Sequence, residues 1–158
     1  MHRVVDNLLD QDYFNEIKNI LFGDEFPWFF KDHITDESDE DKFYYTHNFY
    51  DNYESNSHYF GLVKGILNVL ECNSILRVRA SSYLRSEKTI VNKPHCDYEF
   101  SHKGCLLYLN ENNGLTHFKD GTVKPEENRA ALFDPSIEHS SSHCTDKKRR
   151  VIININYF

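Results

Sequence analysis

The sequence is poor in the features that mark several large classes of protein. Its 158 residues include only 4 cysteines, and no apolar run approaches the roughly 20 residues that a membrane helix needs. The cysteines show no Cys-x-x-Cys spacing, so we expect free thiols rather than a zinc site or a disulfide framework. The first residues include an acid and no apolar segment typical of a secretory signal. We therefore expect a cytoplasmic protein without membrane contacts.

Positive charge is also scarce. The chain has 18 Lys and Arg against 25 Asp and Glu, which gives a formal net charge of −7 at pH 7. A broad phosphate-binding surface needs clustered Lys and Arg, so this balance disfavours nucleic acid as a partner. With 39% hydrophobic residues, the chain can fill one core, and its length suits a single domain over residues 1–158.

The sequence of residues 1–74 indicates a helical and aromatic support region and contains no catalytic or binding motif. Asp10 or Asp12 can cap a first helix, whose apolar residues recur at helical spacing before Gly23 ends it. Ser57 is expected to cap a second helix that runs to about Leu70. The other expected elements are a strand over 4–9, a solvated acidic loop over 36–41, and a strand over 43–50 in which His47 is structural. The aromatic segment over 26–30 is expected to be a core plug, with the wall of a substrate cleft as the alternative.

Residues 75–158 predict a series of short strands separated by turns. Turn residues stand at 112–114, 120–121 and 134–136. The expected strands cover 75–80, 106–110, 115–118, 130–133, 137–142 and 149–158. Two helices followed by many short strands indicate an α+β fold, with the chemistry in this second region.

His95 and Asp97 are the first candidate metal ligands. Side chains alternate sides along an extended backbone, so these two point the same way while Cys96 points the other way. A third, neutral imidazole would complete one face of ligands around a metal and leave the opposite positions open. That arrangement suits a non-haem Fe(II) oxygenase.

Two histidines compete for the third ligand position. If residues 139–150 form a hairpin that turns at Cys144 and Thr145, paired residue numbers sum to 289, which places His139 opposite Arg150 on one face. His143 would then lie in the turn as an exposed loop residue. We therefore expect His139 to be the ligand, with His143 as the alternative.

Arg150 begins a strand in which polar and apolar residues alternate. Ile152, Asn154 and Asn156 share its face, which we expect to line a pocket, and the other face is apolar. A guanidinium is a permanently charged planar fork that can hold a carboxylate through two parallel hydrogen bonds. The side chain of Arg149 is expected on the opposite face, away from the pocket.

Five motifs stand in a fixed order from residue 95 onward. They are His95-x-Asp97, Leu-Tyr-Leu-Asn over 107–110, Gly-x-Thr-x-Phe over 114–118, Phe133-Asp134 before His139, and Arg150 at the head of Arg-Val-Ile-Ile-Asn. This ordered set resembles the prolyl 4-hydroxylase-type 2-oxoglutarate/Fe(II) dioxygenases, and small phage-encoded members most of all. The resemblance covers about residues 75–158.

The resemblance implies a double-stranded β-helix, a jelly-roll of the cupin type, with residues 75–158 as its metal-binding core and the N-terminal helices packed on one sheet. His95, Asp97 and His139 would hold Fe(II). Arg150 would bind the distal carboxylate of 2-oxoglutarate, together with Tyr108, Asn154 and, as a weaker candidate, Tyr83. The family pattern also selects His139 over His143.

The implied reaction uses O2 and 2-oxoglutarate to hydroxylate a protein, peptide or amino-acid side chain, with release of succinate and CO2. Two other readings stay open. The chain could be a β-helix module that binds metal without turnover, or an oxidative demethylase of nucleic-acid bases, although the acidic charge balance disfavours the second. Substrate specificity is expected in the loops over 26–54 and 85–94, which contain no motif that identifies a substrate. The sequence does not indicate an oligomeric state.

Overall fold

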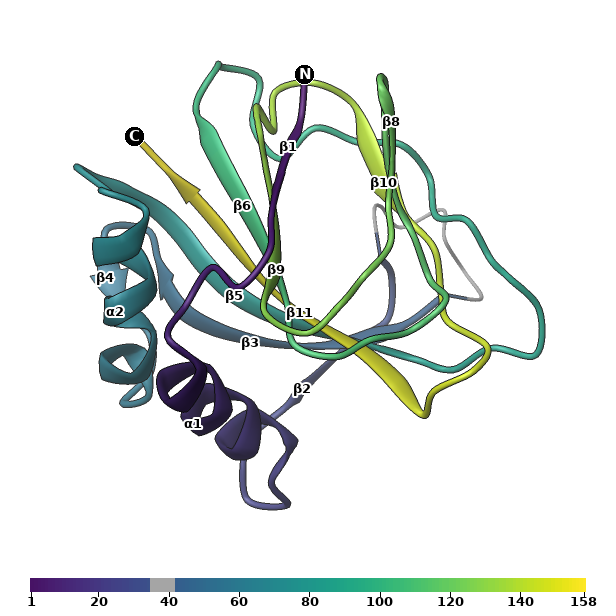
Figure 1. Cartoon of the computed structure of the whole chain (residues 1–158), viewed down its shortest axis with the longest axis horizontal. Coiled ribbons are helices and arrows are strands. Elements are labelled where there is room, and N and C mark those ends of the chain that lie inside the picture. Colours follow the sequence, from purple (N-terminus) through teal and green to yellow (C-terminus); the bar gives the residue numbers. More distant parts are fainter. Residues whose placement is uncertain (35–41) are drawn as a thin grey trace.

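A computed structural model gives the fold of this chain and describes residues 1–34 and 42–158 (Figure 1). The acidic run predicted as a loop over 36–41 lies outside the described residues. Two helices and two antiparallel sheets make up the described part, and no helix there is long and apolar enough to cross a membrane. The helices are α1 (Gln11–Phe22) and α2 (Phe60–Val69).

The larger sheet has eight strands and contains segments from the whole length of the chain. Its order is β1-β9-β6-β11-β5-β3-β2, and β4 pairs with β3 beside this path. The strands are β1 (Arg3–Val5), β2 (Phe29–Lys31), β3 (Tyr44–Asp51), β4 (Glu54–Ser55), β5 (Ile75–Leu84), β6 (Lys103–Tyr108), β9 (Arg129–Phe133) and β11 (Arg149–Tyr157). Strands from the predicted support region therefore pair directly with strands of the predicted core.

The smaller sheet has three strands in the order β10-β7-β8. They are β7 (Thr116–Phe118), β8 (Gly121–Val123) and β10 (His139–Ser141). The connection between β5 and β6 runs along the free edge of β10 and forms isolated bridges from Val91 to Ser142 and from His95 to His139. Strand β8 was not predicted, because the turn residues at 120–121 were the only signal read there.

The helices cover one face of the large sheet, and the small sheet lies across its other face (Figure 1). Phe14, Ile17 and Leu21 of α1 are fully buried with Val63 and Ile66 of α2. This cluster also contains the apolar face of β11, formed by Val151, Ile153 and Ile155. A second, smaller core between the sheets includes Ile152, Leu106, Tyr108 and Val123. The alternation predicted along β11 is therefore confirmed.

The sequence correctly predicted both ends of α1 but not the start of α2. Asp10 caps α1 by accepting hydrogen bonds from the backbone N–H groups of Asp12 and Tyr13, and Gly23 ends the helix, as predicted. Ser57 is not the N-cap of α2, because Tyr59, two residues further on, holds that position. The Ser57 hydroxyl accepts a hydrogen bond from the N–H of Tyr59 and also forms one with Nε2 of His47, which agrees with a structural role for His47.

The aromatic segment over 26–30 is only partly a core plug. Phe26 is buried in the main core, whereas Phe29 and Phe30 are 59% and 57% exposed on the edge strand β2. Likewise, the strand expected over 4–9 is limited to Arg3–Val5, because Asn7 adopts a positive φ of 52° that breaks the extended backbone.

The predicted hairpin between His139 and Arg150 is wrong. Strand β10 pairs with β7, and His139 lies opposite Phe118. Arg150 lies opposite Tyr83, because β11 sits between β5 and β6 in the large sheet. The segment between β10 and β11 therefore crosses from one sheet to the other and does not fold back as a turn.

Candidate metal centre and adjacent cavity

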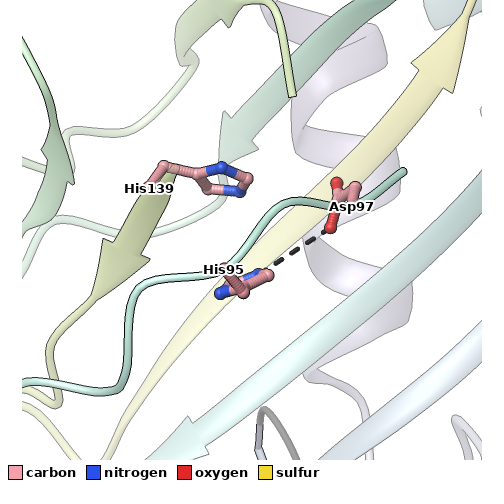
Figure 2. Close-up of side chains that lie close together, drawn as sticks. All are labelled: His95, Asp97 and His139. Carbon is pink, nitrogen blue, oxygen red and sulfur yellow. Dashed lines mark ion pairs between the residues drawn. The ribbon is translucent and has the colours of Figure 1, made fainter. Parts of the chain in front are cut away.

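His95, Asp97 and His139 converge between the two sheets (Figure 2). One ligand atom from each lies within 4.8 Å of the others. His95 and Asp97 come from the connection between β5 and β6, and His139 begins β10. The structure therefore brings together the three residues that the sequence predicts as ligands, in a group that could hold a metal ion.

Backbone hydrogen bonds fix the two segments against each other. The N–H of His95 donates to the carbonyl of His139 at 2.9 Å, and the N–H of His139 donates to the carbonyl of His95 at 3.0 Å. The N–H of Asp97 donates to the carbonyl of Pro135 at 2.9 Å. A segment without regular strand structure is therefore held in place by β10 and the turn before it.

The protonation states favour metal binding. Burial alone raises the pKa of Asp97, but Arg77, His139, the Asn154 amide and His95 together lower it to about 2. Burial, together with the nearby His95, lowers the pKa of His139. Nδ1 of His139 lies 3.0 Å from the carbonyl of Ile137, to which it donates, so Nε2 keeps its lone pair for a metal. At neutral pH the site thus offers an ionised carboxylate and a neutral imidazole.

Two polar side chains support Asp97 from the large sheet. Nδ2 of Asn154 donates to Oδ2 of Asp97 at 3.1 Å. A guanidinium nitrogen of Arg77 lies 3.1 Å from Oδ1, in an ion pair that lacks hydrogen-bond alignment. Behind Asn154, the amide of Asn156 contacts its side-chain oxygen at 3.4 Å, and His102 contacts Asn156 at 2.8 Å. The carboxylate is therefore oriented as well as ionised.

Replacing Arg77 with glutamine should raise the pKa of Asp97 in the metal-free protein. Burial raises this pKa, and Arg77 is the charge that opposes the effect of burial most strongly. A pKa held below its ordinary value of 3.8 stabilises the fold above that value, and this contribution is lost as the pH falls toward about 2. The variant should therefore be less stable than the wild type at neutral pH, and this difference in stability should shrink as the pH falls toward about 2. Carbon-detected NMR titration of the Asp97 carboxyl measures the shift directly.

Arg79→Gln is the matched control, since Arg79 occupies the same strand face two residues away and is not among the main groups that act on Asp97. An Asp97 pKa that stayed near 2 in Arg77→Gln and rose in Arg79→Gln would contradict the role given to Arg77.

Arg150 is fully buried beside this centre and is held by three acceptors. Its Nη1 donates to the carbonyls of Leu115 and Ser142 at 2.9 and 2.8 Å, and its Nη2 donates to Oγ1 of Thr116 at 2.7 Å. The Nε–H is buried without an acceptor. No carboxylate pairs with Arg150 in the described ranges, although an unpaired buried charge is costly.

One cavity joins Arg150 to the metal ligands. It is narrow, with about 30 Å³ of space for the centres of water molecules, and part of it is open to solvent. Its walls come from both sheets: Arg79, Ser81, Tyr83, His95, Leu106, Thr116, His139, Ser140, Ser141, Arg150, Ile152 and Asn154. We call this the Arg150 cavity. It places an unneutralised guanidinium and two candidate metal ligands on the wall of the same space.

The other predicted site residues lie close by. Tyr108 is fully buried, its hydroxyl is 2.7 Å from Oγ1 of Thr116, and its ring faces the Arg150 guanidinium at 5.8 Å. Tyr83 pairs with Arg150 across the sheet and stacks on Tyr44. Asn154 lines the cavity, but its amide contacts Asp97 and not Arg150. Its predicted contact with a cosubstrate therefore stays a prediction, and the structure gives it a supporting contact to a ligand.

His143 is not the exposed loop residue that the predicted hairpin implied. It is 7% exposed, its Nδ1 donates to the carbonyl of Leu84 at 3.1 Å, and it packs edge-on against Tyr83. Among the described residues, the His/Asp cluster that suits a metal does not include it. Arg149 points away from the cavity onto the rings of Phe22 and Trp28, as predicted.

Several polar residues of the site were not singled out from the sequence. Arg77 and Arg79 alternate with the buried Val78 on β5, so strand periodicity alone puts both on the cavity side. That signal could have been read. Thr116 belonged to a quoted motif without a role, and the contact of His102 with Asn156 had no sequence signal.

Sequence comparison finds no matching family model and no matching curated protein. The fold, in contrast, has many counterparts. A prolyl hydroxylase from Trichoplax adhaerens, in complex with a hypoxia inducible factor peptide fragment, matches at 12% identity with a TM-score of 0.67, over 99% of this chain and 83% of its own. This chain has the fold of the 2-oxoglutarate/Fe(II) oxygenases. The resemblance read from the sequence is confirmed at that level.

Two further neighbours support the same fold. A 2OG-Fe(II) oxygenase family oxidoreductase from Burkholderia pseudomallei matches at 10% identity and a TM-score of 0.65, over 99% of this chain and 83% of its own. A viral collagen prolyl hydroxylase from Paramecium Bursaria Chlorella virus-1 matches at 12% identity and a TM-score of 0.54, over 99% and 90%. All three cover nearly the whole chain, residues 1–74 included.

Proposed function

We propose that this protein is a 2-oxoglutarate- and Fe(II)-dependent dioxygenase that hydroxylates a side chain of a protein, a peptide or a free amino acid. The observation that carries this proposal is Arg150, a fully buried guanidinium without a carboxylate partner among the described residues, on the wall of the cavity that also reaches His95 and His139. The proposal includes the double-stranded β-helix as the architecture, formed by a single domain of residues 1–158 with its metal-binding core over 75–158.

The residues present fit an Fe(II) ion. Two imidazoles and one carboxylate form the ligand set that leaves open positions for other ligands, and Asp97 and His139 are already in their metal-binding protonation states. When bound, the iron would supply the activation of O2. The protein's own part is to fix the ligands, through the bridge between His95 and His139 and the contact from Asn154 to Asp97.

The Arg150 side chain fits a carboxylate. Nε–H and one Nη2–H lie on the same edge of a guanidinium, and here Nε has no acceptor while Nη2 gives only one bond, to Thr116. The distal carboxylate of 2-oxoglutarate could accept hydrogen bonds from both of these N–H groups. The Tyr108 hydroxyl, which contacts Oγ1 of Thr116, lies beside them. The Tyr108 and Tyr83 rings and Ile152 would exclude water around this pair, which strengthens it.

The overall reaction balances without any further reagent. One oxygen atom of O2 enters the substrate as a hydroxyl group, and the other enters the succinate that forms when 2-oxoglutarate loses CO2. The peptide bound to the Trichoplax neighbour supports a protein or peptide substrate for this chain, and the free state of all four cysteines supports the cytoplasm as its place.

Turnover is tested by succinate formation. The purified protein with Fe(II), 2-oxoglutarate and O2 should form succinate, and formation should stop when iron is replaced by Zn²⁺, which occupies similar ligands but has no redox chemistry. Mass spectrometry should find one oxygen atom added to the accepted substrate for each succinate formed. Tight binding of Fe(II) and 2-oxoglutarate without succinate, across a broad substrate panel, would instead identify a binding module.

A further inference from the structure

The Arg150 cavity contains a second guanidinium that the proposed chemistry does not use. Arg79 lies on β5, on the same strand face as Arg77, Ser81 and Tyr83, and lines this cavity together with His95 and His139. Across the sheet it pairs with Asn154 on β11 and Asn48 on β3. Since Asn154 contacts Asp97, Arg79 stands next to the candidate metal centre.

Arg79 has no partner within the described part of the chain. Its Nε is buried without an acceptor, and neither an ion pair nor a hydrogen bond is formed by its side chain there. The other arginines with buried guanidinium surface differ: Arg77 and Arg129 contact carboxylates, Arg149 stacks on two rings, and Arg150 has three acceptors. A half-buried charge without an acceptor is unfavourable unless a ligand supplies one.

The carbon chain of the cosubstrate is shorter than the backbone spacing of the two arginines. Arg150 pairs with Tyr83, which lies four residues along β5 from Arg79, a separation of roughly 13 Å in a strand. A five-carbon chain has four C–C bonds of about 1.5 Å and thus cannot exceed roughly 6 Å. A dicarboxylate held at Arg150 would therefore reach Arg79 only if the two side chains leaned toward each other along the strands.

We infer that Arg79 binds a carboxylate of the prime substrate and so selects substrates that carry an anionic group near the carbon that is oxidised. This inference rests on the proposed function. A carboxylate fits the planar fork of one arginine, whereas phosphate sites usually gather several cations. Arg77, two residues away on the same strand face, is already paired with Asp97. The carboxylate comes either from a free amino acid or from an acidic residue of a peptide. A neutral peptide segment would leave Arg79 unpaired.

The first experiment observes Arg79 itself and does not depend on turnover. The protein is labelled with ¹⁵N-arginine, loaded with Zn²⁺ and saturated with 2-oxoglutarate, and the Nε–H signal of Arg79 is assigned by its loss in Arg79→Gln. Acetate should shift this signal in a saturable manner, and acetamide, its neutral counterpart, should not. Arg3, which is exposed on β1, reports non-specific binding in the same spectrum. An Arg79 signal that moves only when the Arg3 signal moves would overturn the inference.

The second experiment identifies the source of the carboxylate. In one arm, calorimetry compares free L-amino acids with their C-terminal amides; in the other, it compares capped peptides containing Asp or Glu with the same peptides containing Asn or Gln. In one of the two arms, the compound with the carboxylate should bind at least tenfold more tightly than the matching amide. Arg79→Gln should abolish this preference, Arg79→Lys should keep part of it, and Arg3→Gln should leave it unchanged.

The outcomes separate this inference from the proposed function. A protein that binds no 2-oxoglutarate in the same calorimeter contradicts the proposed function itself. A protein that binds 2-oxoglutarate normally, but prefers the acid equally with and without Arg79, contradicts only the role of Arg79. A large loss of 2-oxoglutarate affinity in a folded Arg79→Gln variant would assign Arg79 to the cosubstrate and also overturn the inference.

Discussion

Replacing Arg150 with alanine should weaken 2-oxoglutarate binding by roughly 30-fold to several thousand-fold while the protein still binds Fe(II). The range follows from the loss of about 2–5 kcal/mol when one partner of a buried, hydrogen-bonded charge pair is truncated. Arg150 is fully buried and does not contact His95, Asp97 or His139, so the metal ligands should keep their positions. Calorimetric titration of 2-oxoglutarate into the Fe(II) protein under nitrogen measures the loss.

Two further variants make this test specific. Arg150→Ala also removes hydrogen bonds to the backbone of Leu115 and Ser142, so Arg150→Lys, which keeps the charge and loses the planar fork, should give an intermediate affinity in a protein that folds. Arg149→Ala is the matched control one residue away on the opposite strand face, where it stacks on Phe22 and Trp28. Equal 2-oxoglutarate affinity in wild type and Arg150→Ala would rule out the assignment.

Replacing His139 with alanine should abolish tight iron binding, as should the same change at His95 or Asp97. Each of these residues supplies one of the ligand atoms that lie within 4.8 Å of each other. The loss should exceed the roughly 10- to 100-fold that removal of a supporting residue costs, because a ligand bond itself disappears. Anaerobic Fe(II) titration followed by metal analysis gives the affinity, and circular dichroism verifies that each variant is folded.

His143 provides the matched control for His139. Both are buried histidines in the same stretch of chain, at 7% and 6% exposure, and each donates a hydrogen bond from Nδ1 to a backbone carbonyl. His143→Ala should keep iron binding close to that of the wild type. Iron retained in His139→Ala and lost in His143→Ala would show that the ligand choice was wrong.

These predictions rest on a site whose ligands and polar supports come from separate parts of the chain. Asp97 belongs to the connection between β5 and β6, its supports Arg77 and Asn154 come from β5 and β11, and His139 comes from the small sheet. The pKa of Asp97, at about 2, reflects this convergence, because burial alone would raise it. The candidate metal centre is therefore a property of the packed sheets and not of the His95-x-Asp97 motif alone.

The sequence by itself determined the features that depend on neighbouring residues. The alternation of β11 assigns Arg150, Ile152 and Asn154 to one face whatever the strand pairs with, because the period of two follows from backbone geometry. The cap at Asp10 and the end at Gly23 follow from local hydrogen bonding in the same way. The ordered motifs added the resemblance to a family, which correctly indicated the fold.

Only the tertiary structure decided which strands pair and which side chains meet. A hairpin between β10 and β11 was the simplest local solution, but β11 gains two neighbours in the centre of the large sheet, while β10 pairs with β7 and holds His95 through a bridge. Such long-range pairing leaves no period in the sequence. For the same reason the buried position of His143, the contact of Asn154 with Asp97 and the unpaired state of Arg79 became visible only once both sheets had closed around the cavity.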